Sequence, residues 1–89
     1  MTKKETIKDG LVEEFYRRSF LEIILGKKPK LRSKKYYKNG KRDGLHEIFY
    51  ENGQLKEKRN YKDGKEDGFS EEYYENGQLK YGRNYIDGK

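Results

Sequence analysis

The 89-residue chain contains no cysteine, no tryptophan, one proline and one histidine. Without cysteine it forms neither disulfides nor thiolate metal sites, and nothing in it indicates an oxidising compartment. It also lacks a long apolar run, and Met1 leads directly into a charged segment. We therefore expect no signal peptide, no membrane-spanning segment and a cytoplasmic location.

Side chains suited to catalysis are scarce as well. The only histidine, His46, has a serine 24 residues further on, so we expect it to occupy a tolerant outer strand position rather than to act as a base. Phosphate-binding glycine motifs and the EF-hand ligand order are missing. Aspartates recur only beside turn glycines, where they usually bond to the backbone. The sequence predicts no enzyme, no cofactor and no metal site.

Apolar residues are also few, at 30% against 43% charged, a balance close to that of disordered chains. Nine tyrosines and four phenylalanines argue against disorder, because they recur regularly. Tyrosine buries its ring while its hydroxyl stays wet. A chain of this length hides only ~60% of its unfolded surface. We expect a thin, elongated fold held together by tyrosines.

A repeat of 24 residues is the strongest pattern in the chain. Residues 37–60 read YKNGKRDGLHEIFYENGQLKEKRN, and residues 61–84 read YKDGKEDGFSEEYYENGQLKYGRN. A partial copy, YIDGK, follows at residues 85–89. The predicted organisation is an N-terminal helical cap with a degenerate first repeat at residues 1–36, followed by the repeats of residues 37–89.

Each copy has the pattern of a β-hairpin. Asn52-Gly53 and Asn76-Gly77 predict type I′ turns, because both residue types tolerate positive φ angles. Between the turns, side chains alternate: Leu45, Glu47 and Phe49 point one way. The predicted strands are residues 31–38, 45–50, 55–62, 69–74 and 79–86, and they form an antiparallel meander.

An aromatic pair followed by ENGQLK, and then YxDGKxDG, resembles the MORN repeat family and in particular its bacterial variant. The resemblance covers residues 37–89. It implies a mainly β fold, a single elongated antiparallel sheet with stacked aromatic rows. Bacterial proteins that resemble this variant are often labelled antitoxin-like, and the resemblance extends that expectation to this chain.

The first 36 residues leave two interpretations open. Six apolar residues fall on one face of a helix, namely Val12, Phe15, Tyr16, Phe20, Ile23 and Ile24. Alternatively, a degenerate copy of the repeat begins near Phe20, and residues 21–25 form a strand. A compromise has a helix over residues 10–19 and then a strand to Leu25. In each case we expect this segment to lie on the sheet as a cap.

Positive charge is concentrated in one block. Residues 27–42 hold nine basic residues and no acidic one, whereas residues 43–89 hold eight basic and eleven acidic residues. Such blocks bind polyanions or acidic protein surfaces, or they are solvated, lysine-protected sheet. The candidate partner-binding cations are Lys27, Lys28, Lys30, Arg32, Lys34, Lys35, Lys38, Lys41 and Arg42. The candidate aromatic contacts are Tyr36, Tyr37, Tyr50 and Tyr74.

Three binding functions follow. The first is a small inhibitor or antitoxin-like blocker of a larger protein, such as a toxin or a CRISPR-type defence nuclease, because an exposed sheet with Tyr and Arg has the composition of interaction hot spots. The second is direct binding of RNA or single-stranded DNA by the basic block, with tyrosines stacking on bases. The third, anionic membrane-surface work, ranks last. An open edge at residues 79–86 also allows a homodimer.

Overall fold

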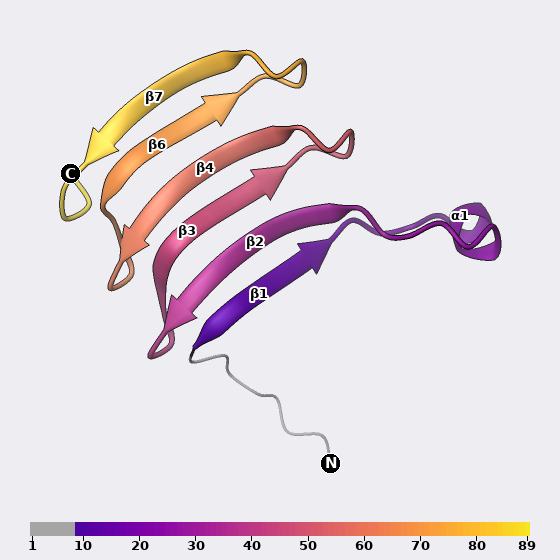
Figure 1. Cartoon of the computed structure of the whole chain (residues 1–89), viewed down its shortest axis with the longest axis horizontal. Coiled ribbons are helices and arrows are strands. Elements are labelled where there is room, and N and C mark those ends of the chain that lie inside the picture. Colours follow the sequence, from indigo (N-terminus) through magenta and orange to yellow (C-terminus); the bar gives the residue numbers. More distant parts are fainter. Residues whose placement is uncertain (1–8) are drawn as a thin grey trace.

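The computed structural model describes residues 9–89, which form one antiparallel sheet and one short helix outside it (Figure 1). The fold as a whole measures 46 × 44 × 13 Å. The strand order is β1-β2-β3-β4-β6-β7, and the short β5 pairs with β4. The thinness reflects a single layer of strands, as the low apolar content predicts. The elements are β1 (Gly10–Phe15), α1 (Phe20–Ile24), β2 (Leu31–Lys38), β3 (Lys41–Phe49), β4 (Leu55–Lys62), β5 (Lys65–Glu66), β6 (Gly68–Tyr73) and β7 (Leu79–Tyr85).

The predicted mainly β fold and antiparallel sheet are confirmed, but the N-terminal helical cap is wrong. Residues 10–15 form β1, an edge strand paired with β2. The only helix among the described residues is α1, five residues long, and it buries none of them. The six apolar residues come from β1, from Tyr16 directly after it and from α1, so the helical face that they form in the sequence does not exist in the structure. Residues 1–8, part of the predicted cap, lie outside the described residues.

A third copy of the repeat therefore exists, displaced from the 24-residue period. Residues 9–16 read DGLVEEFY, matching DGLHEIFY at residues 43–50 and DGFSEEYY at residues 67–74. The register agrees as well, because Phe15 faces Leu31 as Phe49 faces Leu55. In this first copy, residues 17–30 replace the four-residue turn of residues 51–54, an insertion of ten residues.

The turns differ from the expected types. The two-residue hairpin turns are Asn39-Gly40 and Asp63-Gly64, which have positive φ angles at both positions, as a type I′ turn requires. At Asn52-Gly53 only the glycine has positive φ. There the Asn52 side chain accepts a hydrogen bond from the Gln54 N–H at 2.9 Å, which closes a longer loop. The type I′ prediction is therefore wrong for Asn52-Gly53 and Asn76-Gly77, where only the glycine has positive φ.

The described residues contain no buried apolar core. Only Ser33, His46 and Ser70 are buried, at the centre of the sheet. In the absence of such a core, pairs of opposite charges on neighbouring strands help to fix the register of the strands. On one face, Glu13 faces Lys34, Lys34 faces Glu47, Glu47 faces Lys58 and Lys58 faces Glu71. A slip by one residue would break this alternation of opposite charges.

The charge ladder ends at Gly82, which occupies the position of Lys58 one repeat later. The Phe69 ring lies over it, 2.9 Å from where a Cβ atom at Gly82 would stand. Phe69 itself replaces the leucine of the preceding repeat, Leu45. The larger ring thus fills the space left by the missing lysine, and the two changes compensate each other.

Candidate binding site

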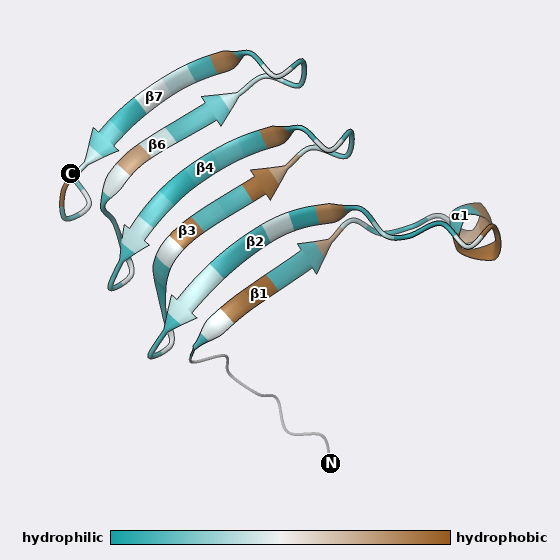
Figure 2. Cartoon of the chain, viewed as in Figure 1, coloured by the Kyte–Doolittle hydropathy of each residue, from teal (hydrophilic) through white to brown (hydrophobic). Residues whose placement is uncertain are grey.

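The insertion between β1 and β2 carries α1 beyond the ends of these two strands (Figure 1). In Figure 2 α1 is predominantly brown, whereas most of the sheet is teal. The four apolar side chains of α1 and that of its C-cap residue are all exposed, and we call them the apolar tip: Phe20, Leu21, Ile23, Ile24 and Leu25. Their exposed fractions run from 51% for Ile23 to 78% for Phe20. An exposed apolar cluster of this kind marks an interaction surface rather than a core.

Local hydrogen bonds hold α1 in one shape. The Ser19 hydroxyl accepts from the Glu22 N–H at 3.1 Å, and the Glu22 carboxylate accepts from the Ser19 N–H at 2.8 Å, forming a capping box. The backbone hydrogen bond from Ser19 lowers the pKa of Glu22. At the other end Gly26 takes a φ of 72°, and the Arg18 guanidinium donates to the Lys27 carbonyl at 2.7 Å. The apolar tip is thus presented by an ordered segment.

Positive charge surrounds the apolar tip. Glu22 is the only acidic residue of the insertion, and the capping box engages its carboxylate. Because both strands of the extended hairpin contribute cations, the base of α1 is basic on either side. We call these five residues the cationic collar: Arg17, Arg18, Lys27, Lys28 and Lys30. An apolar centre with a cationic rim fits a partner with an apolar groove and acidic borders.

The predicted basic block does not form a single patch. Lys34 and Lys35 are neighbours in β2, so they point to opposite faces of the sheet. Lys35 lies 3.3 Å from the Glu14 carboxylate, so its charge is already paired. Lys38 and Lys41 flank the turn at the far end of β2, about 25 Å from the start of the strand at the usual rise per residue. Only the three lysines of the collar remain grouped.

Two arginines of the block are held by tyrosines. The Arg42 guanidinium donates to the Tyr61 hydroxyl at 3.2 Å and lies 5.2 Å from the ring centroid. Burial would lower the pKa of Arg42, but its hydrogen bonds to tyrosines raise it overall. Arg32 lies over the Tyr16 ring at 5.7 Å. Both arginines therefore contribute to the sheet itself, which reduces what they offer to a nucleic acid.

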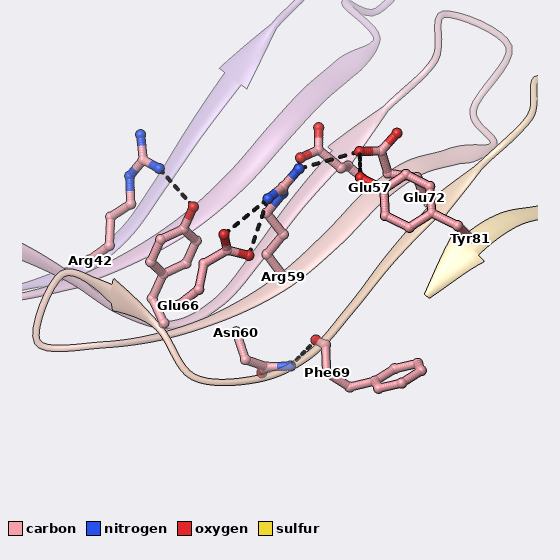
Figure 3. Close-up of polar contacts among 9 residues, drawn as sticks. Arg42, Glu57, Arg59, Asn60, Glu66, Phe69, Glu72 and Tyr81 are labelled. Carbon is pink, nitrogen blue, oxygen red and sulfur yellow. Dashed lines mark hydrogen bonds and ion pairs between the residues drawn. The ribbon is translucent and has the colours of Figure 1, made fainter. Parts of the chain in front are cut away.

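A cluster of charges that the sequence did not indicate joins four strands (Figure 3). Arg59 of β4 lies 3.1 Å from Glu66 of β5 and 3.3 Å from Glu72 of β6, and it also bonds to Glu57. The Tyr81 hydroxyl of β7 donates to Glu72 at 2.6 Å. Burial opposes the charge of Arg59, but the hydrogen bond and charge of Glu57 raise its pKa above the ordinary value. The cluster stabilises the sheet where β4 meets β6.

Two hairpins of near-identical sequence, stacked edge to edge in one sheet, are the units that the family comparison finds. The MORN repeat variant matches residues 42–63 and residues 66–87. The chain contains two MORN repeats. The hairpin of β1 and β2, with its insertion, precedes both matched segments. No curated protein and no solved structure matches the chain.

Stacked tyrosines connect the MORN repeats to each other and to the first hairpin. The Tyr16 hydroxyl donates to the Phe49 carbonyl at 2.6 Å, and the Tyr50 hydroxyl donates to the Tyr73 carbonyl at 2.8 Å. A cation covers each ring of the row at 5.7 Å; the pairs are Arg32 with Tyr16, Lys56 with Tyr50 and Lys80 with Tyr74. Tyr50 is therefore structural, and Tyr74, the last of the row, is 50% exposed.

The other two candidate aromatics lie on opposite faces. Tyr36 faces Leu11 of β1 and is 41% exposed. Tyr37 is half-buried and faces Arg42 of β3. Tyr36 also contacts the position of Gly44, where an added Cβ would lie 3.4 Å from the Tyr36 Cβ. The two tyrosines do not form a joint platform on which bases would stack.

His46 occupies the centre of the sheet, not the tolerant outer position expected from the sequence. It is 6% exposed in β3, and its ring centroid lies 5.6 Å from that of Tyr61. The Nδ1 atom is buried without a hydrogen-bond partner in the described part of the chain. Burial, reinforced by the charges of Arg42 and Lys35, lowers the pKa of His46 to about 4. The ring is neutral at pH 7.

This burial predicts a pH dependence of stability. The unfolded chain takes up a proton on His46 below its ordinary pKa of 6.5, whereas the folded chain does so only near 4. The free energy of unfolding should therefore fall as the pH drops from 6.5 towards 4, by about 1–2 kcal/mol at pH 5 because water reaches both faces of the sheet.

Urea unfolding of the wild type and of His46→Ser at pH 7 and pH 5 measures this effect. Serine is the natural residue at the equivalent position, Ser70, which is also buried. The variant should lose most of the difference between the two pH values. An unchanged difference in His46→Ser would show that another group titrates.

Within residues 9–89 no three His, Asp or Glu side chains are grouped to hold a metal ion, and no helix is long and apolar enough to cross a membrane. The apolar tip was missed as a surface because the sequence pattern assigned its residues to a cap. The motif DGxxExxY, present at residues 9–16, was the signal that would have identified the first hairpin.

Proposed function

We propose that the chain is a non-catalytic binding module that docks onto a larger protein by inserting the apolar tip into a groove with acidic borders. The observation that carries this proposal is the exposure of four large apolar side chains of a capped helix, and of Leu25 at its C-cap, with no residue of the helix buried. The hydrogen-bonded sheet is the rigid part of the protein from which α1 projects.

The cationic collar favours an acidic protein surface. Cations around an apolar anchor accelerate association with a negative partner and fix its orientation. An ordered anchor also loses less conformational entropy on binding than a flexible one. A nucleic acid offers no apolar groove for the tip, and the remaining cations of the basic block are divided between both faces and both ends of β2. The apolar contribution therefore favours protein over nucleic acid.

Blocking the partner is the consequence that we propose for docking, because a module without catalytic groups acts by occupying a surface. The antitoxin-like role, the bacterial origin of the variant and a nucleic-acid enzyme as the target stay predictions. They rest on the resemblance and on the basic composition, and partner capture is the experiment that addresses them.

The substitution Ile24→Glu tests the docking proposal. It places a carboxylate in the middle of the apolar tip, at a residue that is 61% exposed. Binding to the captured partner should weaken at least 10-fold, because a charge would be desolvated in the groove. The partner would be isolated from nuclease-treated lysate with immobilised wild type and its affinity measured by calorimetry.

Ile86→Glu is the matched control. Ile86 is 71% exposed and lies on the turn after β7, where the preceding repeat has Lys62, so a charged residue fits there. This variant should bind as the wild type does. Equal binding by both variants would contradict docking through α1. If the captured material is no longer retained after nuclease treatment, RNA binding is favoured over protein binding. If the wild type binds phosphatidylserine vesicles and Ile24→Glu does not, the apolar tip binds a membrane rather than a protein.

A further inference from the structure

The two edge strands of the sheet, β1 and β7, are equivalent to strands that pair with each other inside the sheet. Strands β1, β3 and β6 are equivalent by repeat, as are β2, β4 and β7. Inside the sheet, a strand equivalent to β7 pairs twice with a strand equivalent to β1: β2 pairs with β3, and β4 pairs with β6. Among the described residues β7 pairs only with β6, and β1 pairs only with β2. Each exposed edge is therefore the natural neighbour of the other.

We propose that the chain assembles head to tail, with β7 of one copy pairing antiparallel with β1 of the next in the register of β4 with β6. This self-association is independent of the docking of α1. The β7 end is already arranged for this contact, because residues 85–89 form the turn that follows β7: the Gly88 N–H donates to the Glu66 carbonyl at 2.8 Å, as the Gly64 N–H donates to the Arg42 carbonyl at 2.8 Å.

Three side chains at the β7 end have equivalents that cross an interior junction. Arg59 binds Glu72, and its equivalent, Arg83, lies over the Tyr85 ring at 5.1 Å without a carboxylate within 4.0 Å in the described residues. In the proposed pairing, Glu14 of the next copy takes the place of Glu72. Arg83 would thus gain the counterpart of the ion pair between Arg59 and Glu72, and it would share the Glu14 carboxylate with Lys35, which lies 3.3 Å from it in the same copy.

The other two side chains are a tyrosine and an asparagine. Tyr50 donates across the junction to the Tyr73 carbonyl, and its equivalent, Tyr74, would donate to the Phe15 carbonyl of the next copy. Asn60 donates to the Phe69 carbonyl at 3.0 Å, and its equivalent, Asn84, would donate to the Leu11 carbonyl. Head-to-tail pairing completes the same hydrogen bonds that join the interior repeats.

Charge selects this arrangement over pairing between two copies of the same edge. The charged side chains of β7 are Lys80 and Arg83, and those of β1 are Glu13 and Glu14. Pairing β7 with β7 would bring cations together, which is unfavourable, whereas β7 with β1 brings opposite charges together. Because the contact joins two different surfaces, each addition leaves a new β7 edge, and the assembly grows with concentration.

Sedimentation velocity at protein concentrations from about 1 to 300 μM tests the proposal, with mass action setting the expected growth. The weight-average mass of the wild type should rise beyond that of a dimer. Arg83→Glu and Glu14→Arg should each stay monomeric, because like charges then meet at the junction. An equimolar mixture of the two should assemble, since the altered β7 edge of one variant then meets the altered β1 edge of the other with opposite charges. At every second junction, Arg83 of the Glu14→Arg variant meets the unchanged Glu14 of the Arg83→Glu variant, which is the wild-type pair of charges.

Lys56→Glu is the matched control: the same change of charge, at a cation that also lies over a tyrosine ring but on the interior strand β4. It should assemble as the wild type does. Circular dichroism establishes that each variant is folded. If Glu14→Arg does not fold, substoichiometric Arg83→Glu should still shorten wild-type assemblies, because its intact β1 edge adds to them and its altered β7 edge stops growth.

A wild type that stays monomeric over the whole concentration range would overturn the proposal. So would assembly of Arg83→Glu to the wild-type extent, or a mass that stops at two copies irrespective of Glu14. Failure of two folded variants to assemble when mixed would also refute it. Loss of docking in Ile24→Glu with unchanged assembly would separate this inference from the proposed function.

Discussion

Arg59→Met is expected to lower the free energy of unfolding by about 2–3 kcal/mol at pH 7, the largest loss we predict for a single substitution. Glu57 faces Glu72 directly across the β4–β6 pairing, and Arg59 neutralises both. Without the guanidinium, three carboxylates stay close together. The side chains of the cluster are 19–25% exposed, so water screens them only partly.

Urea unfolding at dilute protein measures this loss, and Arg83→Met provides the control. Arg83 is the equivalent residue one repeat later, and among the described residues it has no carboxylate within 4.0 Å, so its substitution should cost less than about 0.5 kcal/mol. Adding Glu72→Gln to Arg59→Met should restore part of the stability, since it removes one of the opposed charges. Equal effects of the two arginine substitutions would show that the cluster does not stabilise the sheet.

Replacing residues 17–30 by Glu-Asn-Gly-Gln is expected to abolish partner binding and leave the sheet folded. The insertion starts and ends on backbone geometry that the other hairpins share, because the Tyr16 N–H donates to the Lys30 carbonyl at 2.9 Å as the Tyr50 N–H donates to the Gln54 carbonyl at 2.8 Å. Closing four residues rather than fourteen should raise the free energy of unfolding by about 1 kcal/mol.

Thermal unfolding and calorimetry with the captured partner test this replacement. The reciprocal variant, in which residues 17–30 are grafted at positions 51–54 of the shortened chain, should bind again, since the hairpin of β3 and β4 has the same register at its end. Partner binding by the shortened chain would show that the surface lies on the sheet rather than on α1. Unfolding of the shortened chain would show that the insertion supports β1.

Local patterns were sufficient for the long strands of residues 31–89, although the two-residue β5 at Lys65–Glu66 was not predicted. The strands predicted at residues 31–38 and 55–62 have the observed bounds, and the others differ by up to four residues at an end. Turn glycines and alternating side chains are local features, and each copy of the repeat states them again. The turn type was misjudged because Asn-Gly also suits the longer loop at residues 51–54, where Asn52 closes the loop with its side chain.

The N-terminal segment shows where local patterns fail. Its apolar residues fit a helical face, but the strand of residues 10–15 forms because β2 offers a partner in the register of the other hairpins. An inserted segment also shifted this copy from the 24-residue period, so the strict period placed it near Phe20. Comparing residues 9–16 with residues 43–50 without a fixed spacing identifies the copy.

The repeat, the turn residues and the alternation of side chains are enough to predict a mainly β repeat protein whose strands and hairpins follow one another in chain order. The groups that each side chain contacts depend on the tertiary structure. It buried His46, gathered three carboxylates around Arg59, divided the basic block between two faces and left the apolar tip exposed. The reason is that an apolar or charged pattern specifies a face of an element, whereas its partner depends on which strand lies alongside.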